Sequence, residues 1–325
     1  LTPGRDFRLI WTAGIVSQLG DWSARLALAL LVLERGNGAT TVGIVGLLFV
    51  APWLGPGQFL TALSTRFGRR PVMIAADSFR GIAFVLIGAL SPSTLPLLVI
   101  VGLAALADPV FEATKSAFVT EIVPKDDYSE AIQVTHAANQ AASLAGYALG
   151  GLLVAIAGPE LTLALNGVTF MVSSSLVILV RATGARESVG AQGPSFRAGF
   201  DFLRSDRISG VAFLATVLAV TTAMSVESQV AVYGQVVARF DESTIGLLSA
   251  VTPGATLVAV AAVSTGGDDR ILLRRGLLIA GLAALGSALL FFPGFGGIGA
   301  FVGFSLVGVI FGFVTWTNVV VGRRI

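Results

Sequence analysis

Charged side chains recur inside the long apolar stretches of this sequence, where a lipid environment would make each charge costly. Asp21 lies ~12 residues into the first stretch, roughly 18 Å along a helix, and Arg25 follows one helical turn later. A charge at bilayer depth costs at least ~2.5–3.5 kcal/mol and therefore indicates either a function or a compensating partner. Two interpretations follow: a proton or substrate site that faces a central cavity, or a structural Asp21–Arg25 ion pair.

A second set of charges falls on one stripe of a predicted helix. Asp108, Glu112 and Lys115 recur at helical spacing. The stripe could relay protons or bind a cationic substrate, whereas Glu112 and Lys115 could instead pair with each other at the membrane edge. Asp108 has no evident partner nearby in the sequence and stays a candidate for a proton or substrate site. We expect Asp108 and Glu112 to face the interior of a helix bundle.

Other polar residues suggest gating or structural roles. Asp77 and Arg80 are three residues apart, and we expect them to pair beside an Arg-rich loop. Glu227 could line an outward-facing mouth or sit at a solvated helix end. His136 is the only histidine, and a lone histidine at a helix end is usually a satisfied polar residue. The loop residues expected to gate or anchor the cytoplasmic side are Arg66, Gly68, Arg69 and Arg70.

Long apolar stretches must position these side chains. The mean hydropathy is +0.85, and charged residues make up 12% of the chain, about half the ~25% of a soluble domain. We count about ten stretches long enough to cross a ~30 Å hydrocarbon core as helices, which predicts an all-α, multi-pass membrane protein. The predicted spans are Leu9–Leu33, Val42–Leu63, Val72–Leu90, Leu95–Phe118, Ala131–Ala157, Leu161–Val180, Ile208–Val230, Ile245–Val263, Leu277–Phe292 and Ile298–Val321.

The basic residues predict the orientation of these spans. Nearly all of them fall in alternate loops, while Arg35 and Arg239 fall in the others. Cytoplasmic loops carry an excess of Lys and Arg, so we expect the N-terminus to be cytoplasmic in a bacterial inner membrane.

The longest loop ends in a segment with Phe196 and Phe200 on one helical face, which predicts a helix at the cytoplasmic interface or packed under the bundle. The predicted domains are a six-helix bundle (1–181), a cytoplasmic linker (182–207) and a four-helix bundle (208–325).

Composition argues against several classes of protein. The chain has no Cys and one His, which argues against a disulfide framework, a Cys-ligated metal site and a His-based catalytic triad. No Gly-x-x-x-x-Gly-Lys-Ser/Thr loop is present, so we do not expect ATP-driven transport by this chain. The net charge is only +2, and membrane topology accounts for the Arg residues without nucleic-acid binding. We expect no enzymatic activity, no cofactor, no metal and a monomeric state.

The two halves carry a weak internal repeat. STRFGRRPVMIAAD (64–77) and DDRILLRRGLLIAG (268–281) both place an Arg and then an Arg-Arg pair before an apolar helix. Such repeats are typical of transporters built from duplicated bundles. A second bundle of six spans would need two more helices after Val321. We therefore expect a twelve-span chain, of which these residues would be a part that does not transport alone.

These features together resemble the major facilitator superfamily, and within it a branch of macrolide-efflux and enterobactin-exporter-like proteins. The resemblance rests on SQLGDW (17–22), TRFGRRPVMIAADSFRG (65–81), FEATKSAFVTEIVPKDDYSEA (111–131) and GYALGGLLVAIAG (146–158). Three positions depart from the family patterns. Thr61 and Thr65 stand where the loop motif has Gly and Asp, and Tyr147 stands where the fifth-helix motif has Pro.

The same segment contains a small-residue face. Gly146 and Gly150 form a Gly-x-x-x-Gly pair, with Gly151 beside them. Small residues let membrane helices approach closely, so we expect these glycines to pack against a neighbouring helix.

The resemblance implies a secondary active transporter that exports small amphipathic organic molecules, such as drugs or siderophore-like compounds, by proton-coupled alternating access. Asp21 and Asp108 would supply charge in the cavity. Two alternatives stay open: a nutrient importer of the same fold, and a non-transporting membrane scaffold or receptor.

Overall fold

The computed structural model describes most of the chain. The described residues are 4–54, 57, 60–61, 66–124, 127–181, 204–206, 209–211, 213–215, 217, 227–262, 269–290 and 296–322. Thr65, nearly all of the predicted linker 182–207 and most of the predicted span Ile208–Val230 lie outside them.

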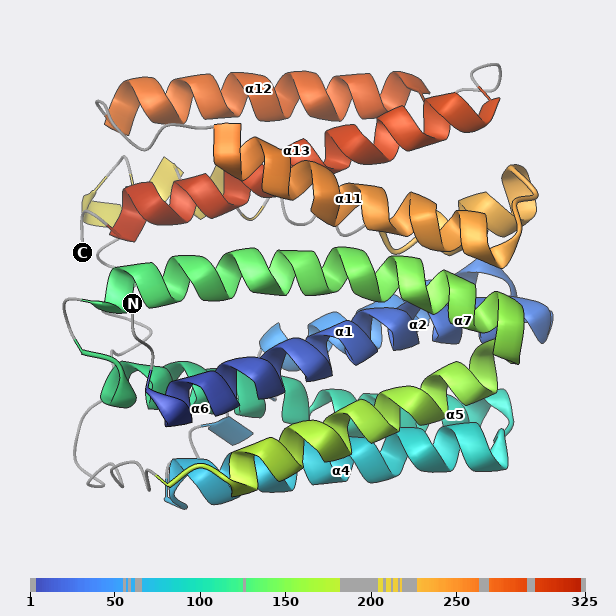
Figure 1. Cartoon of the computed structure of the whole chain (residues 1–325). Coiled ribbons are helices and arrows are strands. Elements are labelled where there is room, and N and C mark those ends of the chain that lie inside the picture. Colours follow the sequence, from blue (N-terminus) through green and yellow to red (C-terminus); the bar gives the residue numbers. More distant parts are fainter. Residues whose placement is uncertain are drawn as a thin grey trace. The chain divides into compact units, whose positions relative to one another are not determined.

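The described elements are helical, and they confirm the predicted all-α membrane bundle (Figure 1). The helices are α1 (Arg5–Glu34), α2 (Gly38–Leu54), α4 (Arg69–Leu90), α5 (Thr94–Ala105), α6 (Ala107–Ile122), α7 (Tyr128–Ile178), α10 (Val230–Val232), a π-helix η2 (Tyr233–Val237), α11 (Glu242–Ala262), α12 (Asp269–Leu290) and α13 (Gly296–Gly322).

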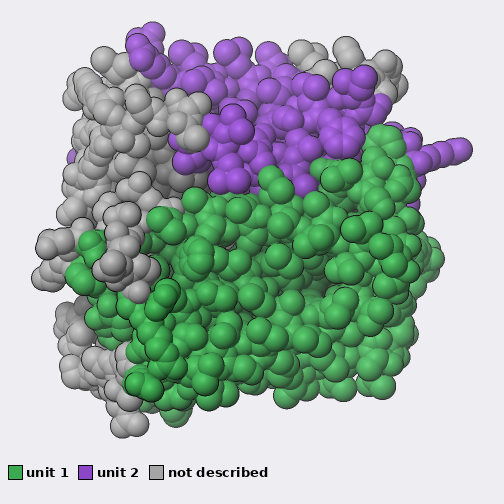
Figure 2. Space-filling view, viewed as in Figure 1, with its two compact units in different colours: residues 1–190, 240–247 green, residues 191–239, 248–325 purple. Residues whose placement is uncertain are grey.

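Within the described residues, five helical stretches are long and apolar enough to cross a membrane. They are Arg5–Glu34, Arg69–Leu90, Thr94–Ile122, Val134–Ile178 and Glu242–Val260. The chain divides into two compact units, coloured separately in Figure 2. The first contains residues 1–190 and 240–247, and the second contains 191–239 and 248–325.

In the first unit, α7 makes its most extensive contacts with α1 and then with α4. The two spans predicted at Ala131–Ala157 and Leu161–Val180 form this one 51-residue element, which bends sharply at Gly158 (Figure 1). Gly158 has φ 82°, a conformation that glycine adopts without a steric penalty, and Pro159 cannot donate a helical hydrogen bond. A turn of one residue therefore replaces the expected loop.

The predicted fourth span, Leu95–Phe118, is divided into α5 and α6 at Leu106. Pro109 explains the division, because it lacks the N–H that would donate to the carbonyl of Ala105. Leu106 keeps right-handed helical angles (φ −62°, ψ −25°), so the chain continues in nearly the same direction.

Glycines bring α7 close to α1. A Cβ atom built on Gly146 would lie 2.6 Å from the carbonyl oxygen of Leu19, and one on Gly150 would lie 2.7 Å from the Cα of Ser23. The Ser23 hydroxyl donates to the Gly146 carbonyl oxygen at 2.7 Å across the same contact. A Cβ on Gly151 would lie 2.6 Å from the Cα of Gly246, so its backbone meets the start of α11.

Polar contacts join loops at each end of the first unit. At one end, Arg35 donates to the Pro92 carbonyl oxygen at 2.6 Å and to the Ser91 hydroxyl at 2.7 Å. At the other end, Arg69 pairs with Glu121 at 2.6 Å, and the Arg181 amide donates to Asp6 at 3.3 Å. The alternate-loop distribution of Arg predicted from the sequence therefore corresponds to two ends of this unit.

The second unit pairs α11, from Leu248 onward, with α13. The Thr256 hydroxyl donates to the Gly308 carbonyl oxygen at 3.0 Å, and Thr252 donates to that of Phe304 at 3.3 Å. Both hydroxyls thus find hydrogen-bond acceptors on the neighbouring helix, which is how polar side chains inside a helix bundle avoid being left without a partner. The first unit contains the charged residues that form the candidate site.

Candidate functional site: a buried arginine shared by three carboxylates

Arg80 of α4 lies at the centre of a buried charge cluster. Its guanidinium donates to Asp108 of α6 at 3.0 Å and lies 3.5 Å from Asp21 of α1. It also pairs with Asp77, one turn earlier on α4. Three helices thus direct carboxylates at one guanidinium, and only 3% of the Arg80 side chain is exposed.

Aromatic and hydroxyl groups complete the surroundings of the cluster. The guanidinium carbon of Arg80 lies 4.2 Å from the centre of the Phe170 ring and 5.0 Å from that of Phe111. Ser173 of α7 donates a hydrogen bond to the other carboxylate oxygen of Asp77. Stacking on aromatic faces stabilises a desolvated guanidinium, which explains how the arginine is accommodated in an apolar interior.

Asp21 and Arg25 have different partners. The Asp21–Arg25 ion pair was one of the two interpretations of the sequence, but the ionic contact of Asp21 is with Arg80. Arg25 instead lies between aromatic rings, 4.4 Å from the centre of Trp22 and 4.7 Å from that of Phe49. The α1 helix therefore directs Asp21 and Arg25 to different surroundings, although they are one turn apart.

Asp108 has no partner nearby in the sequence, as expected, but the structure gives it two partners from other helices. Its Oδ1 accepts from Arg80, and its Oδ2 accepts from the Trp53 indole of α2 at 3.3 Å. Both partners lie far from Asp108 in the sequence, so local spacing could not reveal them. The signal in the sequence was depth in the membrane, since Asp21, Arg80 and Asp108 each fall about midway along a predicted span.

The cluster contains more carboxylates than guanidinium groups. Counted alone, the three carboxylates and one guanidinium would carry a net charge of −2 if every group were ionised. An excess of carboxylates in a low-dielectric interior favours proton binding or an incoming positive charge. The arrangement can therefore bind and release a proton between helices. The described residues include no group of three or more His, Asp or Glu side chains arranged to hold a metal ion.

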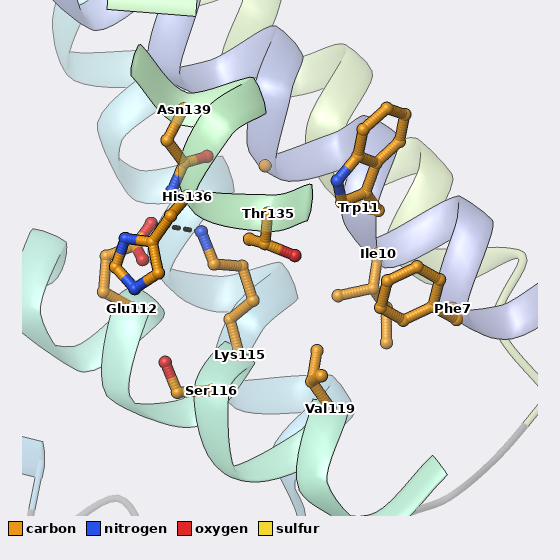
Figure 3. A pocket seen from close by; sticks show the side chains of 11 residues that line it. Phe7, Ile10, Trp11, Glu112, Lys115, Ser116, Val119, Thr135, His136 and Asn139 are labelled. Carbon is orange, nitrogen blue, oxygen red and sulfur yellow. Dashed lines mark hydrogen bonds and ion pairs between the residues drawn. The ribbon is translucent and has the colours of Figure 1, made fainter. Parts of the chain in front are cut away.

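The remaining charges of the α6 stripe lie in a separate pocket. Lys115 donates to Glu112 at 2.6 Å, which is the pairing that the sequence suggested. Both residues line a pocket of ≈ 140 Å³ between α1, α6 and the first part of α7, together with His136 (Figure 3). The stripe thus contributes one residue to the cluster and two to the pocket.

The predicted gating residues surround the start of α4. Gly68 immediately precedes this helix, and the preceding Arg66 is exposed. Arg69 pairs with Glu121 of α6, and Arg70 donates to the Ile178 carbonyl oxygen at the end of α7. These contacts link α4 to two other helices at this end of the unit. Glu227 is half-buried in the second unit.

The fold and the buried charges agree with the comparison to known families. A model of the Major Facilitator Superfamily matches residues 10–324. The chain therefore belongs to the Major Facilitator Superfamily, as the sequence motifs indicated, and it is related to transporters. These comparisons do not support the narrower macrolide-efflux and enterobactin-exporter branch.

Relatives and a solved structure agree with this assignment. The chain is 24% identical over 314 residues to the uncharacterized MFS-type transporter YfiS of Bacillus subtilis (strain 168), covering 92% of the chain and 74% of YfiS. It is 23% identical over 176 residues to YkuC of the same organism, covering 53% of the chain and 41% of YkuC. A crystal structure of a bacterial homolog of the human lysosomal transporter Spinster has the same fold, with a TM-score of 0.71, 16% identity and coverage of 98% of this chain and 75% of that one.

Proposed function

We propose that this protein is a proton-coupled exporter of small amphipathic organic molecules. The Arg80 cluster would be its proton site. It would act as a monomer in the bacterial inner membrane with its N-terminus in the cytoplasm. The observation that carries the proposal is one buried guanidinium shared by carboxylates from three helices.

Proton coupling requires a group whose protonation changes the contacts between moving elements. Asp21 and Asp108 meet this requirement, because each contacts Arg80 from a different helix. Protonation of either carboxylate would remove an ionic contact between that helix and α4. The remaining acidic residues would still balance the guanidinium, so the cluster can exchange a proton without leaving Arg80 unpaired.

Export is the direction implied by the sequence motifs, among them GYALGGLLVAIAG (146–158). The close approach of Gly146 and Gly150 to α1 supports a role for this segment in helix packing. The resemblance to the macrolide-efflux and enterobactin-exporter-like branch is our reason for proposing drugs or siderophore-like compounds as substrates.

The experiment compares the full-length native protein with its Asp108→Asn variant. Both are expressed in bacterial cells loaded with amphipathic dyes of positive, negative and zero charge, and dye retention is followed with and without a proton gradient. We expect the native protein to lower retention of at least one dye only when the gradient is present. Asp108→Asn should lose the gradient dependence, since it removes the charge and keeps the side-chain size.

Asp241→Asn provides the matched control, because Asp241 is exposed and precedes α11. Its carboxylate accepts from the Thr244 amide and hydroxyl, and the hydrogen bond from the hydroxyl holds the pKa of Asp241 below its ordinary value. Greater uptake in expressing cells would favour the nutrient importer. Unchanged retention of every dye, with no accompanying proton flux in vesicles, would favour a non-transporting scaffold or receptor.

A further inference from the structure

The pocket between α1, α6 and α7 has two chemically distinct sides (Figure 3). Its apolar side is formed by Phe7, Ile10 and Val119, with the Trp11 ring beside them. Its polar side is formed by side chains that include the paired charges of the α6 stripe. These polar residues are Glu112, Lys115, Ser116, Thr135, His136 and Asn139. A ligand that fills both sides must be amphipathic.

Two side chains of the pocket have hydrogen-bond donors available to a ligand. The indole Nε1 of Trp11 is buried and has no hydrogen-bond partner within the described structure. The Lys115 ammonium has three N–H donors and directs one of them to Glu112. A buried donor without a partner is costly, so both groups favour a ligand that brings an acceptor. Glu112 is already occupied by Lys115, which disfavours a cationic ligand at this position.

The size of the pocket limits the ligand. Its ≈ 140 Å³ is close to the volume of an engineered apolar cavity of about 150 Å³ that binds benzene. One six-membered ring with a small substituent therefore fits within this volume. Phe7 and the Trp11 ring provide the aromatic surface that such a ring prefers.

We infer that this pocket binds a small aromatic carboxylate. The ring would lie against Phe7, Ile10 and Val119, and the carboxylate would accept hydrogen bonds from the Trp11 indole and the Lys115 ammonium. This inference rests on the proposed export function and assigns a substrate class to it. The pocket is distinct from the Arg80 cluster, since their described residues do not overlap.

The test is equilibrium binding of radiolabelled benzoate to the purified full-length protein in detergent, with benzyl alcohol as an uncharged competitor. We expect saturable benzoate binding that benzyl alcohol displaces only weakly. Trp11→Phe keeps an aromatic ring and removes the indole donor, and it should weaken benzoate binding roughly tenfold, as expected for losing one hydrogen bond to a charged group. The weak affinity for benzyl alcohol should change much less.

A second variant confirms the location. Val119→Trp places a large ring in the pocket and should abolish benzoate binding while the protein still elutes as a single folded species. The inference is overturned if benzoate does not bind the native protein, or if Trp11→Phe and Val119→Trp both bind it with native affinity. Because binding is measured without a proton gradient, a failure here is distinguishable from a loss of coupling through Asp108.

Discussion

The Arg80 guanidinium donates to the Asp108 carboxylate at 3.0 Å and thereby joins α4 to α6 near the middle of both spans. Asp108 also accepts from Trp53 of α2. One carboxylate therefore connects three helices, and its charge state affects all of them.

Arg80→Met should destabilise the protein severely. It removes the shared cation and leaves the buried Asp21 and Asp77 and the partly buried Asp108 without it, and breaking a buried ion pair from one side typically costs about 3–5 kcal/mol. We expect little folded protein, measured by fluorescence-detected size-exclusion chromatography of a tagged variant. Asp77→Asn should be tolerated better, because the other two carboxylates still balance the arginine. Equal folded yields for both variants would show that the cluster contributes little to folding.

Asp21→Asn should abolish proton-coupled transport and preserve folding. Asp21 lies 3.5 Å from the nearest Arg80 nitrogen, whereas Asp108 lies 3.0 Å from it, so neutralising Asp21 leaves the shorter contact with Asp108 intact. Transport in vesicles should lose its dependence on external pH, while the thermal unfolding temperature changes little. Native pH dependence in the variant would place the proton site elsewhere. Poor accumulation of the protein would instead show a structural role for Asp21.

Gly150→Ala should destabilise the contact between α7 and α1. The added Cβ would lie 2.7 Å from the Cα of Ser23, a backbone atom that cannot move independently, and overpacking typically costs about 1–3 kcal/mol. The thermal unfolding temperature in detergent should therefore fall. Gly281→Ala is the matched control, because no heavy atom lies within 4 Å of its added Cβ. A similar response from both variants would argue against the tight helix contact.

The orientation can be tested with single cysteines, since the native chain has none. Ser93 is exposed in the loop before α5, at the end of the unit opposite the Arg-rich loop. We expect an impermeant thiol reagent to label Ser93→Cys in intact cells, and to label Ser188→Cys only in inverted membranes. The reverse pattern would overturn the cytoplasmic placement of the N-terminus.

Hydropathy predicted where most helices lie, because each must supply a long apolar segment to lipid whatever its partners are. The span predicted at Val72–Leu90 is observed as the helix Arg69–Leu90, and the span predicted at Ile298–Val321 is observed as the helix Gly296–Gly322. The bend at Gly158 differs from the expected loop, because the φ of one glycine next to a proline allows the chain to reverse without extra residues.

The composition of the candidate site was only partly predictable. Asp21, Asp77, Arg80 and Asp108 were all identified, since charge is rare in an apolar span and each instance is visible. Their pairing was not, except within α4, because helical periodicity relates residues three or four apart and carries no information on which helices become neighbours. The Trp11 indole was missed for the same reason, because its unpartnered N–H is evident only once α6 and α7 surround it.

The single-residue bend at Gly158 also has a mechanical consequence. The two limbs of α7 both hold α1: Gly146 lies against Leu19 before the bend, and a Cβ on Gly20 would overlap Thr169 after it. Because a single residue joins the two limbs, neither can slide along α1 without moving the other. We therefore expect α1 and both limbs of α7 to move as one rigid body, so that a conformational change would have to occur elsewhere in the molecule.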